Sequence, residues 1–211
     1  MSKNCIIFAG GEPVSRKMIY SYLPKEPYVI CADKGWELAD KNDIKPDLVI
    51  GDFDSSLKPE NEPTKVYPVE KDDTDLMLAI KEGIALGYND FTIFGATGGR
   101  FDHMIGNIQS LAYLLEHNCV GRIISDSERI QLLSPGKYNI YPIKDFSLSL
   151  AAYSEIVGGL SIKGAKYEVD DCVLTNNFPL GISNKITADH AEIEFNKGVL
   201  LVIQSDLCTK F

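Results

Sequence analysis

The feature that most constrains the fold is a regular alternation of short apolar runs with helical patterns over the first 125 residues. The apolar runs predict strands at 5–9, 28–32, 48–50, 65–69, 91–94 and 122–125. Helices are expected between them at 15–23, 34–40, 73–86 and 100–117. Strands that are apolar throughout and separated by helices are typical of a parallel sheet covered on both faces. We therefore predict an α/β fold, with a Rossmann-like parallel sheet and flanking helices in the N-terminal part.

The pattern changes after about Arg129. Helical periodicity ends, and short β-prone runs follow at 137–143, 147–152, 167–173, 191–195 and 199–204. Gly158-Gly159 is interpreted as a turn, and Asn196-Lys197-Gly198 as a tight hairpin. Short β-prone runs separated by turn residues predict a small C-terminal all-β, sandwich-like domain. The expected domains are residues 1–128 and 129–211.

The composition disfavours some classes of binding partner and indicates the cellular compartment. The net charge of −9 disfavours a nucleic-acid partner, which requires a basic face. The five cysteines are scattered and show no spacing typical of zinc sites, which is consistent with a reducing environment. No signal-peptide pattern or apolar run of membrane length is present, so we expect a cytoplasmic protein without a membrane partner.

Two carboxylates stand close together after the third expected strand, in Gly51-Asp52-Phe53-Asp54-Ser55. Mg²⁺ takes oxygen ligands, often one or two carboxylates together with substrate phosphates. The same residue types are also the commonest turn formers. On this stretch alone, a metal-binding turn and a simple polar turn are both possible.

Further polar clusters follow other strands, at the edge where ligands of parallel sheets bind. Asp33 follows the second strand, where dinucleotide-binding folds place a ribose-binding acid, although the GxGxxG fingerprint is missing. Asp72 or Asp73 is expected to cap the next helix, and Asp75 to complement its dipole. Carboxylates not used in capping remain available for a metal.

The segment Gly95–His103 carries three glycines at the start of the longest expected helix. Such a loop allows close approach of a phosphate to a helix N-terminus. Arg100, His103 and Asn107 share one polar face, and arginine suits bidentate phosphate contact, although a lone histidine can be purely structural. No GxxxxGK[ST] motif occurs, which excludes a P-loop enzyme. An apolar stripe expected to be core comprises Phe101, Met104, Ile105, Ile108, Leu111, Ala112 and Leu115.

These motifs together resemble the thiamine pyrophosphokinase family. The matching pieces are Asp33-x-Gly35, Gly51–Ser55, Asp72-x-Thr74-Asp75, Gly98-x-Arg100-x-Asp102-His103 and, more loosely, Gly181–Asn184. The resemblance implies Mg²⁺-dependent transfer of a pyrophosphoryl group from ATP to the hydroxyl of thiamine, giving thiamine diphosphate and AMP. It also implies a homodimer whose active site lies between the α/β domain of one subunit and the β domain of the other.

The resemblance also implies roles for individual residues. Asp52, Asp54, Asp72 and Asp75 would hold Mg²⁺ or orient the substrates, and with Arg100 they form the expected catalytic set. The expected ATP-binding residues are Asp33, Thr74, Gly98, Arg100, Asp102, His103 and Asn107. Ser183 and Asn184 would lie near thiamine. Two alternatives stay open: another Mg²⁺-dependent phosphotransferase or hydrolase, and a non-catalytic nucleotide-binding module.

Overall fold

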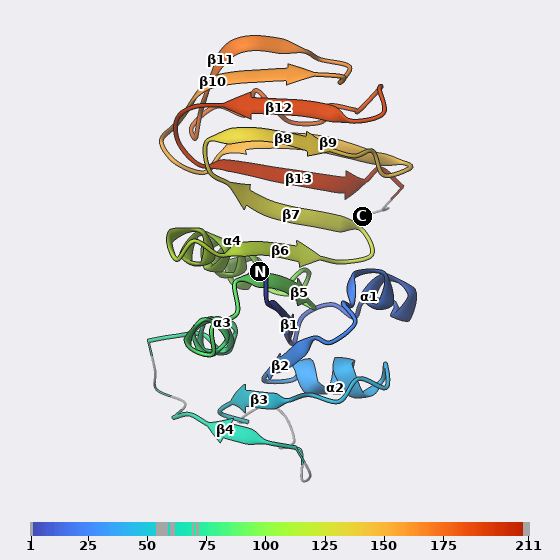
Figure 1. Ribbon diagram of the computed structural model, residues 1–211, viewed down its shortest axis with the longest axis vertical. Helices are drawn as coiled ribbons and strands as arrows, with labels where there is room; N and C mark the ends of the chain where they lie inside the picture. Colours follow the sequence, from blue (N-terminus) through green and yellow to red (C-terminus); the bar gives the residue numbers. More distant parts are fainter. Residues whose placement is uncertain (1, 54–58, 60–61, 69, 71, 209–211) are drawn as a thin grey trace. The chain divides into compact units, whose positions relative to one another are not determined.

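The computed structural model describes residues 2–53, 59, 62–68, 70 and 72–208 (Figure 1). The chain divides into two compact units, Met1–Asp126 and Ser127–Phe211. Each unit has its own cluster of buried hydrophobic residues. No helix among the described residues is both long enough and apolar enough to span a membrane.

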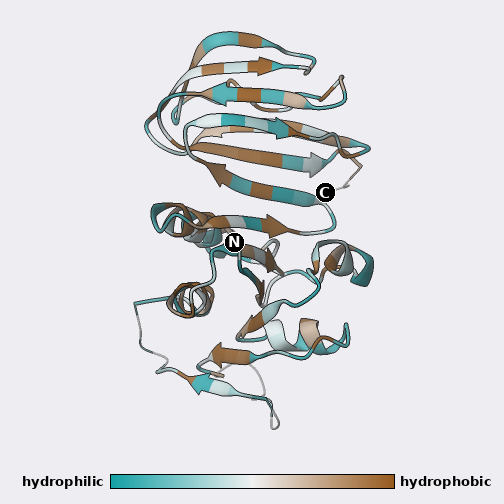
Figure 2. Cartoon of the chain, in the orientation of Figure 1, coloured by the Kyte–Doolittle hydropathy of each residue, from teal (hydrophilic) through white to brown (hydrophobic). Residues whose placement is uncertain are grey.

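The first unit is built on a parallel sheet with strand order β4-β3-β2-β1-β5-β6. Every neighbouring pair in this part of the sheet is parallel, which confirms the α/β expectation. The central strands are apolar along their length because both of their faces are buried (Figure 2). The strands are β1 (Asn4–Phe8), β2 (Tyr28–Ala32), β3 (Leu48–Gly51), β4 (Thr64–Val66), β5 (Asp90–Phe94) and β6 (Val120–Ile124).

Helices cover both faces of this sheet. One buried cluster joins β1 residues Ile6 and Phe8 to Ile19 of the first helix and Ala39 of the second. On the other face, Gly83 of the third helix is so close to Phe91 that an added Cβ would lie 2.6 Å from its ring. The helices are α1 (Arg16–Tyr22), α2 (Gly35–Asp40), α3 (Asp75–Ala85) and α4 (Phe101–Glu116).

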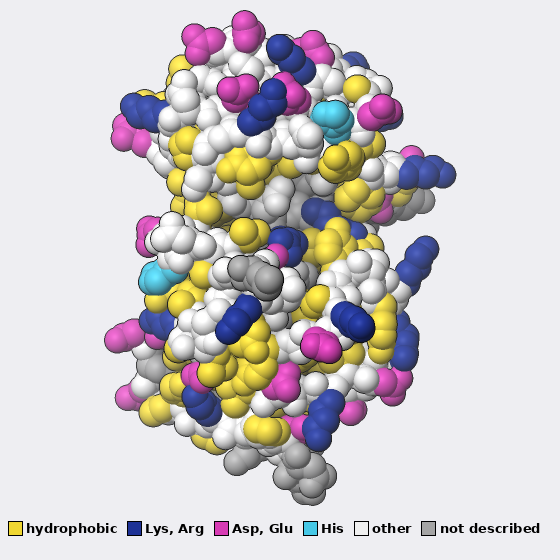
Figure 3. All heavy atoms as spheres, in the orientation of Figure 1, with side chains coloured by type: hydrophobic (Ala, Val, Ile, Leu, Met, Phe, Trp, Pro, Cys, Tyr) yellow, Lys and Arg dark blue, Asp and Glu magenta, His cyan; other side chains and the backbone are white. Residues whose placement is uncertain are grey.

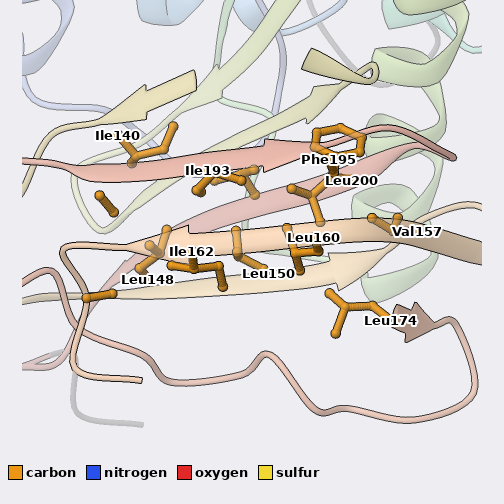
Figure 4. Packing of buried hydrophobic residues seen from close by; sticks show 13 residues of the cluster. Ile140, Leu148, Leu150, Val157, Leu160, Ile162, Leu174, Ile193, Phe195 and Leu200 are labelled. Carbon is orange, nitrogen blue, oxygen red and sulfur yellow. The ribbon is translucent and has the colours of Figure 1, made fainter. Parts of the chain in front are cut away.

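The second unit contains two sets of antiparallel strands. Strands β7, β13 and β9 pair in that order, and β11, β10, β12 and β8 form a four-stranded sheet. Side chains from both sets enter one buried cluster, among them Leu150, Leu200, Ile193 and Leu160 (Figure 4). The strands are β7 (Glu128–Leu133), β8 (Gly136–Ile140), β9 (Phe146–Ala152), β10 (Ile156–Lys163), β11 (Val169–Thr175), β12 (Ala191–Phe195) and β13 (Leu200–Asp206).

Two turn predictions in this unit are wrong. Gly158-Gly159 lies inside β10, where the pairing with β11 shifts register after Val157 and Gly159 adopts φ +68°. An irregularity of this kind uses glycine within a strand and not at its end. Asn196-Lys197-Gly198 is not a hairpin, because β12 pairs with β10 and β8 whereas β13 pairs with β7 and β9. This turn carries the chain from one sheet to the other.

Candidate functional site

The loops that follow β1 and β5 are joined by backbone hydrogen bonds. The Gly11 N–H donates to the Gly95 carbonyl at 2.7 Å, and the Glu12 N–H donates to the Thr97 carbonyl at 2.9 Å. A Cβ on Gly11 would lie 2.5 Å from the Gly95 oxygen, so glycine is required at this approach. The structure therefore brings Gly10-Gly11 and the Gly95–Gly99 loop together at the carboxyl edge of the sheet.

The loops that follow β2 and β3 also meet at this edge. The Asp33 N–H donates to the Ile50 carbonyl at 2.7 Å. A Cβ added to Gly51 would lie 3.2 Å from the Asp33 Cα, and one added to Gly35 would lie 1.9 Å from the Phe8 carbonyl oxygen. Asp33 and Asp52 thus occupy adjoining strand ends, next to the glycine contacts of the first loop.

The glycine-rich loop before α4 has the conformation that its sequence suggests. Gly95, Gly98 and Gly99 adopt φ values of +68°, +72° and +67°, which favour glycine. The Asn107 side-chain amide donates to the Ala96 carbonyl at 2.8 Å and fixes the loop to α4. Thr97 is buried, and its hydroxyl has no hydrogen-bond partner among the described residues. Asn107 is therefore a support of the loop, and Thr97 is a polar group that the sequence did not single out.

Arg100 and Asp102 form an exposed ion pair at the start of α4. The guanidinium donates through Nε to Asp102 Oδ1 at 3.1 Å and through a terminal nitrogen to Oδ2 at 2.5 Å. The Arg100 hydrogen bond and the His103 N–H lower the pKa of the Asp102 carboxyl. The same pairing raises the pKa of Arg100. Arg100 thus pairs with Asp102 at the N-terminus of α4, and His103 in the first turn is exposed.

The predicted apolar stripe of α4 is only partly core. Phe101 is 74% exposed and Ile105 is 43% exposed, whereas Leu111 is 1% exposed. The second half of the helix makes the close contact with β6, because Leu111 and Leu114 both lie against Gly121. The first two turns of α4 therefore present apolar side chains on the surface of this unit.

The segment before α3 also departs from the prediction in one respect. Thr74, not Asp72 or Asp73, is the N-cap, and its hydroxyl accepts a hydrogen bond from the Met77 N–H at 3.2 Å. Asp73 binds the Lys81 ammonium through both carboxylate oxygens at 2.7 Å. Asp72 is exposed, and Asp75 lies in the first helical turn, where a negative charge complements the dipole.

The carboxylates on these loops can be compared with what a metal ion requires. No group of three or more His, Cys, Asp or Glu side chains among them is placed to hold a metal ion. Asp54, the predicted neighbour of Asp52, lies outside the described residues. The pair Asp33 and Asp52 supplies carboxylate oxygens, which suit a hard cation that completes its coordination with water and phosphate oxygens. The donor chemistry therefore fits Mg²⁺.

The Gly181–Asn184 motif is fixed against β9 in the second unit. The Asn184 side chain is buried and accepts from the N–H groups of Tyr167 and Lys185, at 3.0 and 2.8 Å, and donates to the Tyr167 carbonyl at 2.8 Å. Ser183 is exposed with φ +62°, and its N–H donates to the Ser149 hydroxyl at 3.1 Å. Asn184 therefore holds the loop, and Ser183 presents a hydroxyl at its surface.

Comparison with known proteins places both units in one family. Residues 19–121 match the family described as thiamin pyrophosphokinase, catalytic domain, and residues 137–200 match the thiamin pyrophosphokinase vitamin B1 binding domain. A thiamine pyrophosphokinase of Bacillus subtilis is 33% identical over 96% of this chain and 99% of its own length.

Solved structures show the same relationship. A crystal structure of thiamine pyrophosphokinase from Bacillus subtilis superposes with a TM-score of 0.88 at 30% identity, covering 97% of this chain and 99% of that chain. Thiamin pyrophosphokinase from Candida albicans, at 18% identity, shares the fold with a TM-score of 0.79 over 97% of this chain and 90% of that chain. The match thus extends across both units, with their mixed α/β and antiparallel architecture. The chain belongs to the thiamine pyrophosphokinase family.

Proposed function

We propose that this chain transfers the pyrophosphoryl group of ATP to the hydroxyl oxygen of thiamine, which yields thiamine diphosphate and AMP. The new bond forms between that oxygen and the β-phosphorus, the bond between the β-phosphorus and the α,β-bridging oxygen breaks, and the hydroxyl proton leaves. The observation that carries the proposal is the convergence of a glycine-rich loop, Arg100 and two carboxylates on loops at the carboxyl edge of one parallel sheet.

The first unit is proposed as a Rossmann-like nucleotide-binding domain. The left-handed glycines at 95, 98 and 99 allow phosphates to approach the backbone before α4. Arg100, which pairs with Asp102 at the start of α4, would contact the phosphates through its guanidinium. Asp33, Thr74, Gly98 and His103 would complete the surroundings of ATP.

The carboxylates are proposed to position the cation and the acceptor. Asp52, Asp54, Asp72 and Asp75 would hold Mg²⁺ or orient the substrates, with Asp33 beside Asp52. When bound, Mg²⁺ would neutralise charge on the phosphates, which phosphoryl-type transfer requires more than covalent catalysis. Asp54 and Asp72 are equal candidates for the group that accepts the thiamine hydroxyl proton.

The second unit is proposed as a sandwich-like thiamine-binding and dimerisation domain. Ser183 would contact thiamine through its hydroxyl, and Asn184 would keep the loop in place through its three side-chain hydrogen bonds. We further propose a cytoplasmic homodimer in which each active site combines the first unit of one subunit with the second unit of the other. Mixing an Arg100→Ala chain with a Ser183→Arg chain tests this arrangement, because only a shared site restores activity from two inactive parents.

The function is tested by resolving the nucleotide products after incubation with Mg-ATP, with and without thiamine. AMP formed only when thiamine is present supports the proposal. ADP, or hydrolysis independent of thiamine, would indicate another phosphotransferase or hydrolase. Tight ATP binding without turnover would indicate a non-catalytic binding module.

Two variants test the site within the same assay. Asp52→Asn should lower kcat by on the order of 100-fold or more, as expected for the loss of one preorganised electrostatic group. Arg100→Ala should lower kcat/KM for ATP. Arg16→Ala is a matched control, because Arg16 is an exposed arginine that is paired with Asp43 and belongs to none of the proposed residue sets. If the Asp52→Asn and Arg100→Ala proteins are as active as the control, neither residue belongs to the site.

A further inference from the structure

The second unit contains a cavity of about 450 Å³ that the proposed reaction does not use. Its volume lies within the range of roughly 300–1,000 Å³ that is usual for small-molecule sites. None of its lining residues belongs to the sets proposed for ATP, Mg²⁺ or thiamine. They are Pro142, Ile143, Lys144, Asp145, Phe146, Ser147, Lys185, Ile186 and Gln204.

Two lysines lie in the lining of this cavity. Lys144 and Lys185 are exposed, and neither ammonium group has an ion-pair or hydrogen-bond partner among the described residues. By contrast, Lys65, Lys81 and Lys137 each bind a carboxylate at 2.6–2.9 Å.

Asp145 is the one carboxylate in the lining. The Arg129 guanidinium lies 5.8 Å from the centre of the Phe146 ring. The face shown in Figure 3 has basic and acidic side chains interspersed. Two lysines against one carboxylate give the lining a net positive charge, which favours an anionic ligand.

The rest of the lining is suited to a flat apolar group. Ile143, Phe146 and Ile186 supply apolar surface. The Gln204 side chain donates from Nε2 to the Tyr141 carbonyl at 2.9 Å, which fixes the amide and leaves Oε1 as an acceptor. Apolar side chains together with a few oriented polar or charged groups are the usual lining of a small-molecule pocket.

We propose that this cavity binds a small anion in which a flat ring carries a phosphate group. Lys144 and Lys185 contact the phosphate, and Phe146 with the two isoleucines contacts the ring. Both products of the proposed reaction, AMP and thiamine diphosphate, have this chemistry, and naming them rests on the proposed function. The site itself rests on the cavity and its unpaired lysines, so phenyl phosphate should also bind.

The test measures binding of phenyl phosphate, AMP, thiamine diphosphate and inorganic phosphate to the full chain by calorimetry. Hydrogen exchange is followed at residues 142–147 in parallel. All proteins carry Arg100→Ala to weaken binding at the ATP site. We expect phenyl phosphate and at least one of the two products to bind with protection of residues 142–147, and inorganic phosphate to bind more weakly.

Charge-matched variants locate the site. Lys144→Gln with Lys185→Gln should weaken binding by about tenfold or more, since two charge-assisted contacts are lost. Lys163→Gln with Lys197→Gln removes two exposed lysines of the same unit outside the cavity and should leave the affinity within twofold. Equal loss in both double variants, no protection of residues 142–147, or inorganic phosphate binding as tightly as phenyl phosphate would each overturn the proposal. The product assay is independent of these outcomes, so the two proposals fail separately.

Discussion

Gly35 is the position where the structure makes the sharpest prediction about packing. This residue begins α2 directly below the end of β1, and an added Cβ would lie 1.9 Å from the Phe8 carbonyl oxygen and 2.4 Å from its carbon. Contacts of Cβ below 3.0 Å essentially never occur, and the obstacle is backbone, not a mobile side chain. Gly35→Ala therefore forces α2 and β1 apart by about 1 Å.

The expected cost follows from overpacking in a well-packed core. Forced backbone shifts typically cost about 1–3 kcal/mol, and this contact belongs at the upper end because neither partner can rotate away. For a chain of this size, about 3 kcal/mol corresponds to a fall of roughly 6–12 °C in the melting temperature. Because Asp33 and Lys34 precede Gly35 at the site edge, kcat/KM for ATP should fall as well.

Differential scanning calorimetry of Gly35→Ala and Gly106→Ala provides the measurement and its control. Gly106 lies inside α4, and an added Cβ there meets nothing within 4 Å. Alanine should therefore raise the stability by about 0.5–1 kcal/mol through helix propensity. If Gly35→Ala melts within 2 °C of the parent, or if both substitutions shift the melting temperature in the same direction, the inferred contact of α2 with β1 is wrong.

Three further predictions use the same measurements or simple labelling. Thr74→Ala should cost about 1 kcal/mol because α3 loses its N-cap, and Thr74→Ser should keep the stability, as urea unfolding will show. Asn184→Ala should lower the melting temperature, because the backbone N–H and carbonyl of Tyr167 lose their partners; an unchanged melting temperature would contradict the role of Asn184 in holding the loop. At pH 8, iodoacetamide should modify Cys208 in the native protein, because that residue is exposed. It should spare Cys5, where burial raises the pKa to about 12, and Cys31, where burial raises it further, so that both thiols stay protonated, as peptide mass spectrometry can test.

The parallel sheet could be predicted because its signal is local. A strand buried on both faces must be apolar throughout. The run Leu48-Val49-Ile50 therefore indicates such a strand from the local sequence alone. The capping residue of α3 was misjudged because Asp72, Asp73 and Thr74 are all good N-caps. Which of the three caps the helix depends on where the helix begins. Asp73 instead accepts hydrogen bonds from the Lys81 ammonium, one to two turns into that helix.

The second unit was harder because its pairing is not local. Gly158-Gly159 has the composition of a turn, but the chain continues through it as β10, with one left-handed residue absorbed as an irregularity. Similarly, Asn196-Lys197-Gly198 has the residue types of a hairpin turn. The placement of β12 and β13 in different sheets follows from pairing with strands distant in the sequence. The strand β7 also escaped prediction, because partly polar strands with one buried face carry a weaker signal than continuous apolar runs.

The apolar stripe on α4 shows that helical periodicity does not predict burial along the whole helix. Phe101 and Ile105 share a helical spacing with Leu111, yet only Leu111 is buried within this unit. Periodicity reports which face of a helix is apolar, but it does not report how far along the helix the neighbouring element extends. Here the close packing on β6 occurs at Gly121, beside Leu111 and Leu114. An apolar face that continues beyond its packing partner is a surface feature that only coordinates reveal.

The adjacency of Asp33 and Asp52 follows from strand order, which the sequence does not encode locally. Asp33 follows β2 and Asp52 follows β3, and the two strands are neighbours in parallel register, with Ala32 opposite Ile50. The missing Cβ of Gly51 then lets the Asp33 backbone approach, and Asp33 itself turns at φ +45°. A substitution such as Gly51→Ala would add a methyl group 3.2 Å from the Asp33 Cα and alter the spacing of both carboxylates without removing either. Gly51 therefore sets the spacing between the backbones of Asp33 and Asp52, which an interpretation of the motif by its aspartates alone leaves out.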